Sequence, residues 1–196
     1  LFRPDGETPC QPSSAADGAK IVFNEVLADP PNDAPGDANG DGARDNLQDE
    51  LVELVNVGSS AVCLAGWGLG DAEDPFRHRF PVGTSLDPGE ALVVFGGGVP
   101  TGPFAGVTVQ VADFDGSLNL QNAGDLLRLS TPEGDTVTAL SWGDCAGSAC
   151  AADHLSEDLE RDAAITRSPE LSGGWVTHGG AGYSPGTMAD GAAFGD

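Results

Sequence analysis

The apolar residues of the chain fall into short runs separated by glycine and proline, and a helical period of apolar positions is nearly absent. The runs are rich in β-branched residues, which pack well on a pleated sheet and are typical of strands. We predict strands at 21–27, 50–56, 61–64, 67–70, 91–95, 107–111, 126–130 and 137–142. Short strands at this spacing, with turn signals between them, predict an all-β sandwich.

The residues between the runs have the chemistry of turns. In "LDPGE", Pro88 and Gly89 form a β-turn pair, and in "TPEGD" Gly134 is free to adopt a positive φ. Trp67 and Trp142 lie inside predicted strands. Large aromatic side chains at such positions are expected in the core rather than stacked on a ligand.

The 196 residues suit a single domain with tails. We expect a polar leader at 1–19, the sandwich at 20–150, and a C-terminal extension at 151–196. In the extension the strand pattern dissolves, so we predict an irregular strap packed across the sandwich, with Ile165 and Trp175 as its anchors. No apolar run approaches the roughly 20 residues that a membrane-spanning helix requires, so membrane insertion is not expected.

Acidic residues dominate the charge of the chain. Eight basic side chains stand against 31 acidic ones, which gives a formal net charge of −23. Such a field repels phosphate, so neither a nucleic acid nor an anionic membrane surface is an expected partner. A cationic partner or a divalent metal fits better. A salty habitat or a GC-rich genome explains the bulk of the charge equally well, but not the regular spacing of the acids in 37–49.

Four cysteines allow three disulfide pairings. Cys145 and Cys150 lie in "DCAGSAC", a small-residue loop short enough to close locally, so we favour the pairs Cys145–Cys150 and Cys10–Cys63. Disulfides would place the protein outside the cytosol, secreted or at the cell surface. The cysteines form no C-x-x-C pattern, and no histidine is judged near enough in sequence to complete a zinc site.

The order of several motifs resembles that of a lamin tail domain. The motifs are "IVFNEVL" (21–27), "ELVELVN" (50–56), "LAGWGLGD" (64–71), "HRFPVGTSLDPGEALVVF" (78–95) and "LNLQNAGDLLRLSTPEGDTV" (118–137). The closing "ITRSPELSGGWVTH" and "YSPGTMADG" are similar to the tail of bacterial members found in secreted and surface proteins. The resemblance implies an immunoglobulin-like β-sandwich used as a binding or attachment module, and it carries over no catalytic residues.

The stretch "DANGDGARDNLQDE" has the donor spacing of a calcium loop. Alternating oxygen donors can wrap a hard cation while a glycine at the sixth position lets the backbone reverse. The twelfth position, where a bidentate Glu is usual, is Gln48, and two carboxylates follow it. The candidate ligands of a structural Ca²⁺ are Asp37, Asn39, Asp41, the Ala43 carbonyl, Asp45, and Asp49 or Glu50. The alternative is an acidic loop that stays solvated.

No catalytic constellation is evident in the sequence, and we expect no enzyme. The histidines are His78, His154 and His178, and no G-x-S-x-G elbow, Walker loop or dinucleotide fingerprint accompanies them. His78 lies in a strand-like stretch, where a structural or surface imidazole is expected. Glu25, beside Asn24, is expected to hydrogen-bond backbone at a strand edge rather than to act as a general acid.

Two classes of function remain. The first is a non-catalytic extracellular module that attaches its parent to a protein or a cell-surface component. The second is an accessory domain of a secreted nuclease or phosphatase, or a cryptic metal-dependent hydrolase. The glycine-rich stretch 93–106 is the first candidate for a contact surface, and an idle connection is its alternative.

Overall fold

The computed structural model describes residues 10–15, 20–113, 117–145, 149–159, 162–180 and 182–195. Within these residues the chain forms strands and short 3-10 turns, and no α-helix. The strands are β1 (Ile21–Leu27), β2 (Leu51–Asn56), β3 (Val62–Cys63), β4 (Gly68–Gly70), β5 (His78–Arg79), β6 (Ser85–Leu86), β7 (Ala91–Phe95), β8 (Thr108–Val111), β9 (Gly124–Ser130), β10 (Thr136–Gly143), β11 (Asp153–Leu155), β12 (Ile165–Ser168) and β13 (Gly174–Thr177). The 3-10 turns are η2 (Ala34–Gly36) and η3 (Phe104–Gly106). Every strand predicted from the sequence is confirmed.

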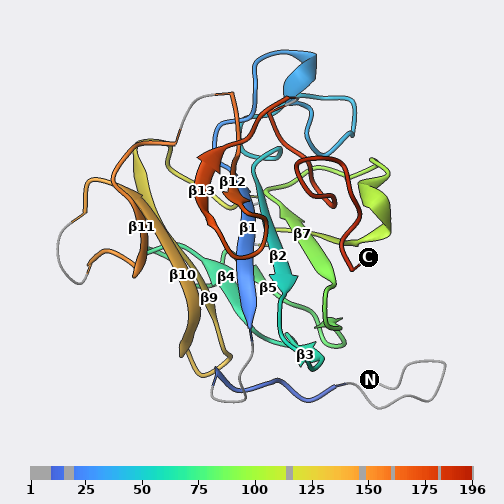
Figure 1. Cartoon of the computed structure of the whole chain (residues 1–196), viewed down its shortest axis with the longest axis vertical. Coiled ribbons are helices and arrows are strands. Elements are labelled where there is room, and N and C mark those ends of the chain that lie inside the picture. The colour runs from blue at the N-terminus through green and yellow to red at the C-terminus, as the bar shows by residue number, and fades with distance from the viewer. Residues whose placement is uncertain are drawn as a thin grey trace.

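The strands form two main sheets that pack face to face (Figure 1). One sheet has six strands in the order β13-β12-β1-β2-β7-β8, and the other has five in the order β11-β10-β9-β4-β5. Strands β3 and β6 form a small separate pair. Most pairings are antiparallel, but β8 runs parallel to β7 and β11 runs parallel to β10. The all-β sandwich predicted from the sequence is therefore confirmed.

The main core lies between the two sheets. Its largest fully buried side chains include Phe23, Trp67, Phe80 and Trp142. The two tryptophans are thus core residues, as predicted, and each indole N–H donates to a backbone carbonyl. Burying aromatic side chains of this size supplies a large share of the hydrophobic stabilisation, because each removes roughly 150–250 Å² from water.

The six-stranded sheet is also covered on its outer face. Along β2 and β7 successive side chains point to opposite faces, so Leu54 joins the main core while Leu51 and Phe95 join a second apolar cluster. This second cluster includes Ala164 and contacts Tyr183, both from the C-terminal segment. All six residues of β2 are consequently buried.

The C-terminal segment is more regular than the predicted strap. Strand β12 pairs with β1, β13 pairs with β12, and β11 extends the other sheet. "ITRS" and "GWVT" are β-prone runs, and β12 fills the otherwise unpaired edge of β1 while β13 pairs with β12. Ile165 is buried in the main core and Trp175 packs against it, so both predicted anchors are in contact with the sandwich.

Both favoured disulfides are formed. Cys10 is bonded to Cys63 and Cys145 to Cys150. Around the first bond, Ser13 donates its backbone N–H to the Cys63 carbonyl over 3.0 Å, and its hydroxyl oxygen accepts from the Cys63 N–H over 3.1 Å. The described part of the predicted leader is therefore attached to the sandwich by a covalent bond and by hydrogen bonds.

The two disulfides should differ in their contribution to stability. They join residues 53 and 5 positions apart in sequence, and closing the longer loop removes more entropy from the unfolded chain. The paired change Cys10→Ala/Cys63→Ala should lower the free energy of unfolding by about 4 kcal/mol, and Cys145→Ala/Cys150→Ala by about 2 kcal/mol. Urea denaturation of the two variants measures this, and equal losses would contradict the expectation.

Candidate functional site

The acidic loop, residues 37–49, lies in the long connection between β1 and β2 (Figure 1). Gly40 and Gly42 both have positive φ, with values of 71° and 94°, which lets the backbone reverse twice over a short distance. The basic residue of the loop, Arg44, donates to the carbonyl oxygens of Pro31 and Pro30 over 2.9 and 2.5 Å. Its guanidinium is therefore engaged with backbone rather than paired with a loop carboxylate.

The side chains of the acidic loop hold its backbone in shape. Asp37 Oδ2 accepts from the Gly42 N–H over 2.9 Å, and Asp41 Oδ1 accepts from the Ala43 N–H over 3.0 Å. Asp45 Oδ1 accepts from two amides that follow it, which lowers the pKa of the Asp45 carboxyl. These bonds compete with regular secondary structure and fix a compact loop.

Asp49 closes the acidic loop from inside the protein. It is fully buried, and its two oxygens accept from the backbone N–H groups of Asn39 and Asp45 over 3.0 and 2.7 Å. Desolvation nevertheless raises the pKa of the Asp49 carboxyl, because burial outweighs these hydrogen bonds. The geometry gives Asp49 a structural role, since both oxygens already have backbone partners.

Glu50, the alternative closing ligand, faces away from the acidic loop. Its Oε2 accepts from the Leu120 N–H over 3.3 Å, and its other charged neighbours are Asp125 and Arg77. Burial raises the pKa of Glu50 to about 9. The change of side follows from the alternation of a strand, because Asp49 and Glu50 are adjacent where β2 begins.

One ligand-type oxygen of the acidic loop has no partner. Asp37 Oδ1 is buried and accepts no hydrogen bond from the described residues. A carboxylate oxygen in this state is costly unless a cation or a water satisfies it. Three loop carboxylates do not already converge, because among the described residues only Cys145, Cys150 and His154 bring three ligand atoms within 4.8 Å of one another. An ion would therefore have to use the Asn39 amide and the Ala43 carbonyl and draw the carboxylates inward.

The glycine-rich stretch 93–106 supports the acidic loop. Asn39 Nδ2 donates to the Gly97 carbonyl over 3.2 Å, and the Val99 N–H donates to Asp41 Oδ2 over 3.2 Å. A Cβ at Gly98 would lie only 2.4 Å from Asn39 Nδ2, so a side chain there would collide with the loop. Gly97–Val99 thus face the acidic loop, although the Val99 side chain is 71 % exposed.

A second acidic group, which we call the buried clasp, lies under the C-terminal segment. It consists of Asn24, Glu25, Glu53, Glu170, His178 and Ser184. Glu25 and Glu53 are direct partners on β1 and β2, and both are fully buried. Ser184 donates its N–H and its hydroxyl to Glu25 over 2.8 and 2.7 Å, and the Gly186 N–H donates to Glu53 over 2.8 Å. Glu25 bonds backbone as expected, but at the middle of a sheet and not at its edge.

The buried clasp must hold extra protons. His178 Nδ1 donates to the Gly179 carbonyl over 2.5 Å, and Nε2 lies 2.9 Å from the Ser184 hydroxyl that also contacts Glu25. One hydroxyl proton cannot serve both bonds, so the group needs a second proton to complete them. Burial also raises the pKa of Glu25, and burial together with the Glu25 charge raises the pKa of Glu53 to about 8.

The histidines occupy three different environments. His78 on β5 is buried, hydrogen-bonded to Gln110 over 2.7 Å, and packed edge-on against Phe80, which is the structural role expected for it. His178 belongs to the buried clasp. His154 lies against the Cys145–Cys150 disulfide. The expectation that no histidine is near enough to join the cysteines in a metal-type group is therefore wrong, because pairing of β11 with β10 brings His154 back to them.

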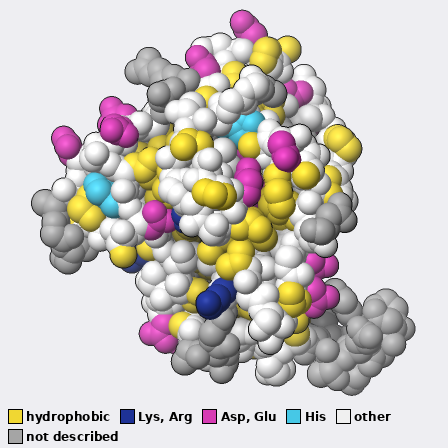
Figure 2. Space-filling view, viewed as in Figure 1, with side chains coloured by type: hydrophobic (Ala, Val, Ile, Leu, Met, Phe, Trp, Pro, Cys, Tyr) yellow, Lys and Arg dark blue, Asp and Glu magenta, His cyan; other side chains and the backbone are white. Residues whose placement is uncertain are grey.

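Acidic side chains also surface around the rim of the face shown in Figure 2, where basic side chains appear at few places. No described helix has the length and apolar character needed to cross a bilayer.

A family model described as Lamin Tail Domain matches residues 14–144. The match includes the acidic loop and ends after β10, before the strands of the C-terminal segment. No curated protein matches the chain.

The buried clasp should make stability depend on pH. The folded-state pKa of Glu53, about 8, lies above its ordinary value of 4.5, so the folded state binds a proton that the unfolded state releases in this window. Stability is then greatest below the ordinary pKa and falls as pH rises toward 8, by at most about 1.4 kcal/mol per pH unit for this group. Urea denaturation at pH 5, 6.5 and 8 should show the fall. Glu53→Gln, which mimics the protonated acid, should reduce the slope, and an unchanged slope would contradict the assignment of the proton to Glu53.

Proposed function

The chain belongs to the lamin tail domain family, and we propose that it serves as a non-catalytic, calcium-binding attachment module of a secreted or surface-exposed protein of the bacterial type. Three features support this proposal. The fold is an immunoglobulin-like β-sandwich. The two disulfides suit an oxidising compartment. The acidic loop combines calcium-type spacing with the unpartnered Asp37 oxygen, and this oxygen carries the calcium assignment.

The charge balance of the acidic loop favours an ion. Asp37, Asp41, Asp45 and Asp49 lie within thirteen positions of sequence, while Arg44 is engaged by two backbone carbonyls. Carboxylates at such distances repel one another, and Ca²⁺ would offset the repulsion. In this proposal Asp37, Asn39, Asp41, Asp45 and the Ala43 carbonyl hold the ion, and Asp49 holds the loop.

The role of such an ion would be structural. It would stiffen the connection between β1 and β2, and the Gly97–Val99 backbone packed against it. The partner is then a protein or a cell-surface component, since the net charge of −23 disfavours nucleic acid and anionic lipid. Residues around the exposed Val99 side chain are the part of the 93–106 stretch that such a partner could reach.

One group of side chains has the residue types of a hydrolase triad. Ser184, His178 and Glu25 are in contact, but Glu25 bonds Ser184, while the far ring nitrogen of His178 bonds a backbone carbonyl. A nucleophile needs a base that a third group orients, and here the carboxylate competes with the histidine for the hydroxyl. This geometry favours a structural role for Ser184, in line with a non-catalytic module.

Calcium should raise the melting temperature. Extracellular calcium modules commonly have Kd values of about 10⁻⁴ to 10⁻³ M. At about 10 mM, Ca²⁺ should therefore raise the free energy of unfolding by about 1.4–2.7 kcal/mol, which corresponds to a rise in melting temperature of about 3–10 °C. Asp37→Asn is the sharpest variant. Its amide oxygen can keep the bond to Gly42, while its NH₂ group replaces the unpartnered oxygen.

Differential scanning calorimetry of the wild type and Asp37→Asn, with and without Ca²⁺, measures the effect. The exposed Glu133→Gln removes the same charge on the hairpin turn between β9 and β10 and serves as the matched control. Glu133→Gln should retain the calcium response and Asp37→Asn should lose most of it. No response in the wild type, or an equal response in Asp37→Asn, would overturn the calcium assignment.

The purified protein should hydrolyse neither DNA nor phosphate esters above background in Ca²⁺, Mg²⁺ or Mn²⁺. A catalytic ion needs an open coordination position and a neighbouring base, and no histidine contacts the acidic loop in the hydrogen bonds of the described residues. Turnover that disappears in Asp41→Asn would instead establish the hydrolase alternative.

A further inference from the structure

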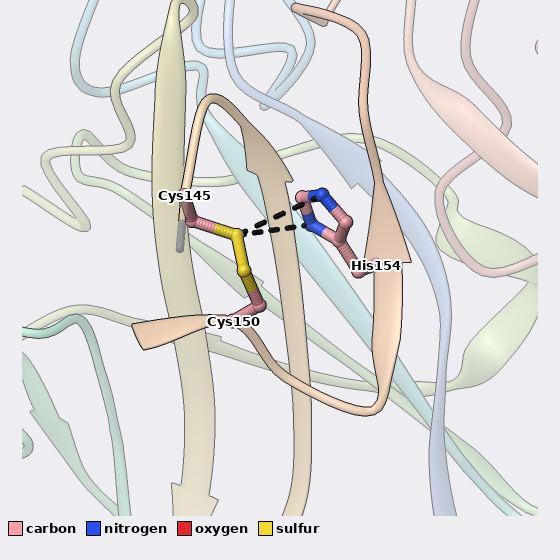
Figure 3. Close-up of side chains that lie close together, drawn as sticks. All are labelled: Cys145, Cys150 and His154. Carbon is pink, nitrogen blue, oxygen red and sulfur yellow. Dashed lines mark hydrogen bonds between the residues drawn. A yellow bond between two sulfur atoms is a disulfide. The ribbon is translucent and has the colours of Figure 1, made fainter. Parts of the chain in front are cut away.

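The Cys145–Cys150 disulfide and His154 meet at one corner of the five-stranded sheet, where β10 ends and β11 begins (Figure 3). Cys145 Sγ lies 3.5 Å from His154 Nδ1 and 3.7 Å from Nε2. The ligand atoms of all three residues lie within 4.8 Å of one another. The corner therefore brings together two sulfurs and an imidazole, which are ligands that zinc and similar ions prefer.

The sulfur-to-nitrogen spacing at this corner already resembles that of a metal centre. With Zn–S near 2.3 Å and Zn–N near 2.05 Å, two ligands on a tetrahedral ion lie about 3.6 Å apart for S and N, and about 3.8 Å apart for two sulfurs. The observed 3.7 Å between Cys145 Sγ and His154 Nε2, the nitrogen proposed as a ligand, is close to the first value. Once reduced, the two sulfurs could separate by side-chain rotation, because their Cα atoms are 5.5 Å apart.

The surroundings of His154 hold it in position. His154 is the register partner of Ser141, and its Nδ1 lies 3.0 Å from the Ser141 hydroxyl. Ser141 is buried, and its hydroxyl oxygen also accepts from the Ala151 N–H over 2.9 Å. A metal-binding imidazole commonly uses its second nitrogen in this way. Nε2 is then the nitrogen available to an ion.

The corner is also accessible and lies in a negative field. His154 is exposed and the two cysteines are half-buried, so reductants and ions can reach them. Cys145 borders a cavity of about 470 Å³. Acidic residues that line the cavity are Asp71, Glu73, Asp125 and Asp144. Arg77 forms ion pairs with Asp71 and Glu73, while the described lining of the cavity contains four acidic residues and no lysine or arginine.

The other disulfide lacks these features. Cys63 is buried, and no histidine joins Cys10 and Cys63 in a group of three ligands among the described residues. Cys145–Cys150 also closes the shorter loop, so opening it should cost less stability. The Cys10–Cys63 disulfide is thus structural, whereas the Cys145–Cys150 disulfide lies where a reductant can open it.

We propose that reduction of the Cys145–Cys150 disulfide creates a binding site for a thiophilic divalent ion such as Zn²⁺, held by Cys145 Sγ, Cys150 Sγ and His154 Nε2. A dithiol reductant gives two electrons and two protons to the disulfide and becomes a disulfide itself. The ion then displaces both thiol protons to solvent. Water fills the fourth position, so the site has the three protein ligands of an open zinc centre.

Titration of Co²⁺ into the protein tests the proposal, after limited dithiol reduction to two thiols per chain and anaerobic removal of the reductant. Peptide mapping confirms that the two thiols are Cys145 and Cys150. We expect one equivalent of Co²⁺ to bind, with thiolate charge-transfer absorption and visible tetrahedral bands. The oxidised protein should show neither signal.

Two variants make the test specific. His154→Ala should weaken Co²⁺ binding by about tenfold or more, since even the outer partners of metal ligands are worth about that much. The residue is exposed, so circular dichroism should show a folded variant. Asp37→Asn should bind Co²⁺ at this site as the wild type does, which separates the proposal from the calcium assignment. Absence of the thiolate absorption in the reduced wild type, or an unchanged affinity in His154→Ala, would overturn the proposal.

Discussion

Strand β2 and the residues that lead into it bury three carboxylates, and each must obtain hydrogen-bond donors from a different part of the chain. Asp49 accepts backbone N–H groups from the acidic loop, Glu50 accepts one from Leu120, and Glu53 accepts one from Gly186. A buried carboxylate without donors costs several kcal/mol unless it is neutralised. The stretch "DELVE" therefore holds three irregular segments against one strand: the acidic loop and the segments around Leu120 and Gly186. These bonds help a glycine-rich chain to form a defined sandwich.

The different partners of Asp49 and Glu50 show what can and cannot be predicted from the sequence. Donor spacing identifies the acidic loop, and β-branched runs identify β2, but the alternation that sends Glu50 to the other side depends on where the strand begins. The strands β12 and β13 are not evident in the sequence for a related reason: their runs are short, and they form strands because β12 pairs with the free edge of β1 and β13 pairs with β12. The buried clasp gives no sequence signal beyond "NE" and "VEL", because the donors to Glu25 and Glu53, apart from the Asn24 amide, come from residues 130 or more positions away.

The sequence predicts a contact well when the two residues are close together along the chain. The five-residue spacing of Cys145 and Cys150 predicted their disulfide, and the other pair followed by elimination. The position of His154 four residues after Cys150 does not by itself place the imidazole beside the sulfurs, because nothing in the sequence shows that β11 runs parallel to β10. Parallel pairing returns the chain to the same end of the sheet, and this places the imidazole beside the sulfurs.

Strand β11 connects this corner to the covering of the six-stranded sheet. Its neighbouring residues point to opposite sides, so His154 faces the disulfide while Asp153 faces the C-terminal segment. Asp153 accepts from Arg167 over 2.5 Å and from the Trp175 indole N–H over 3.1 Å, and Arg167 lies over the Trp175 ring. Arg167 also donates to the Phe23 carbonyl of β1, beside the clasp residue Asn24. A shift of β11 would thus act on contacts that hold β12 and β13, because it would disturb the partly buried Arg167–Asp153 pair and the Trp175 indole bond.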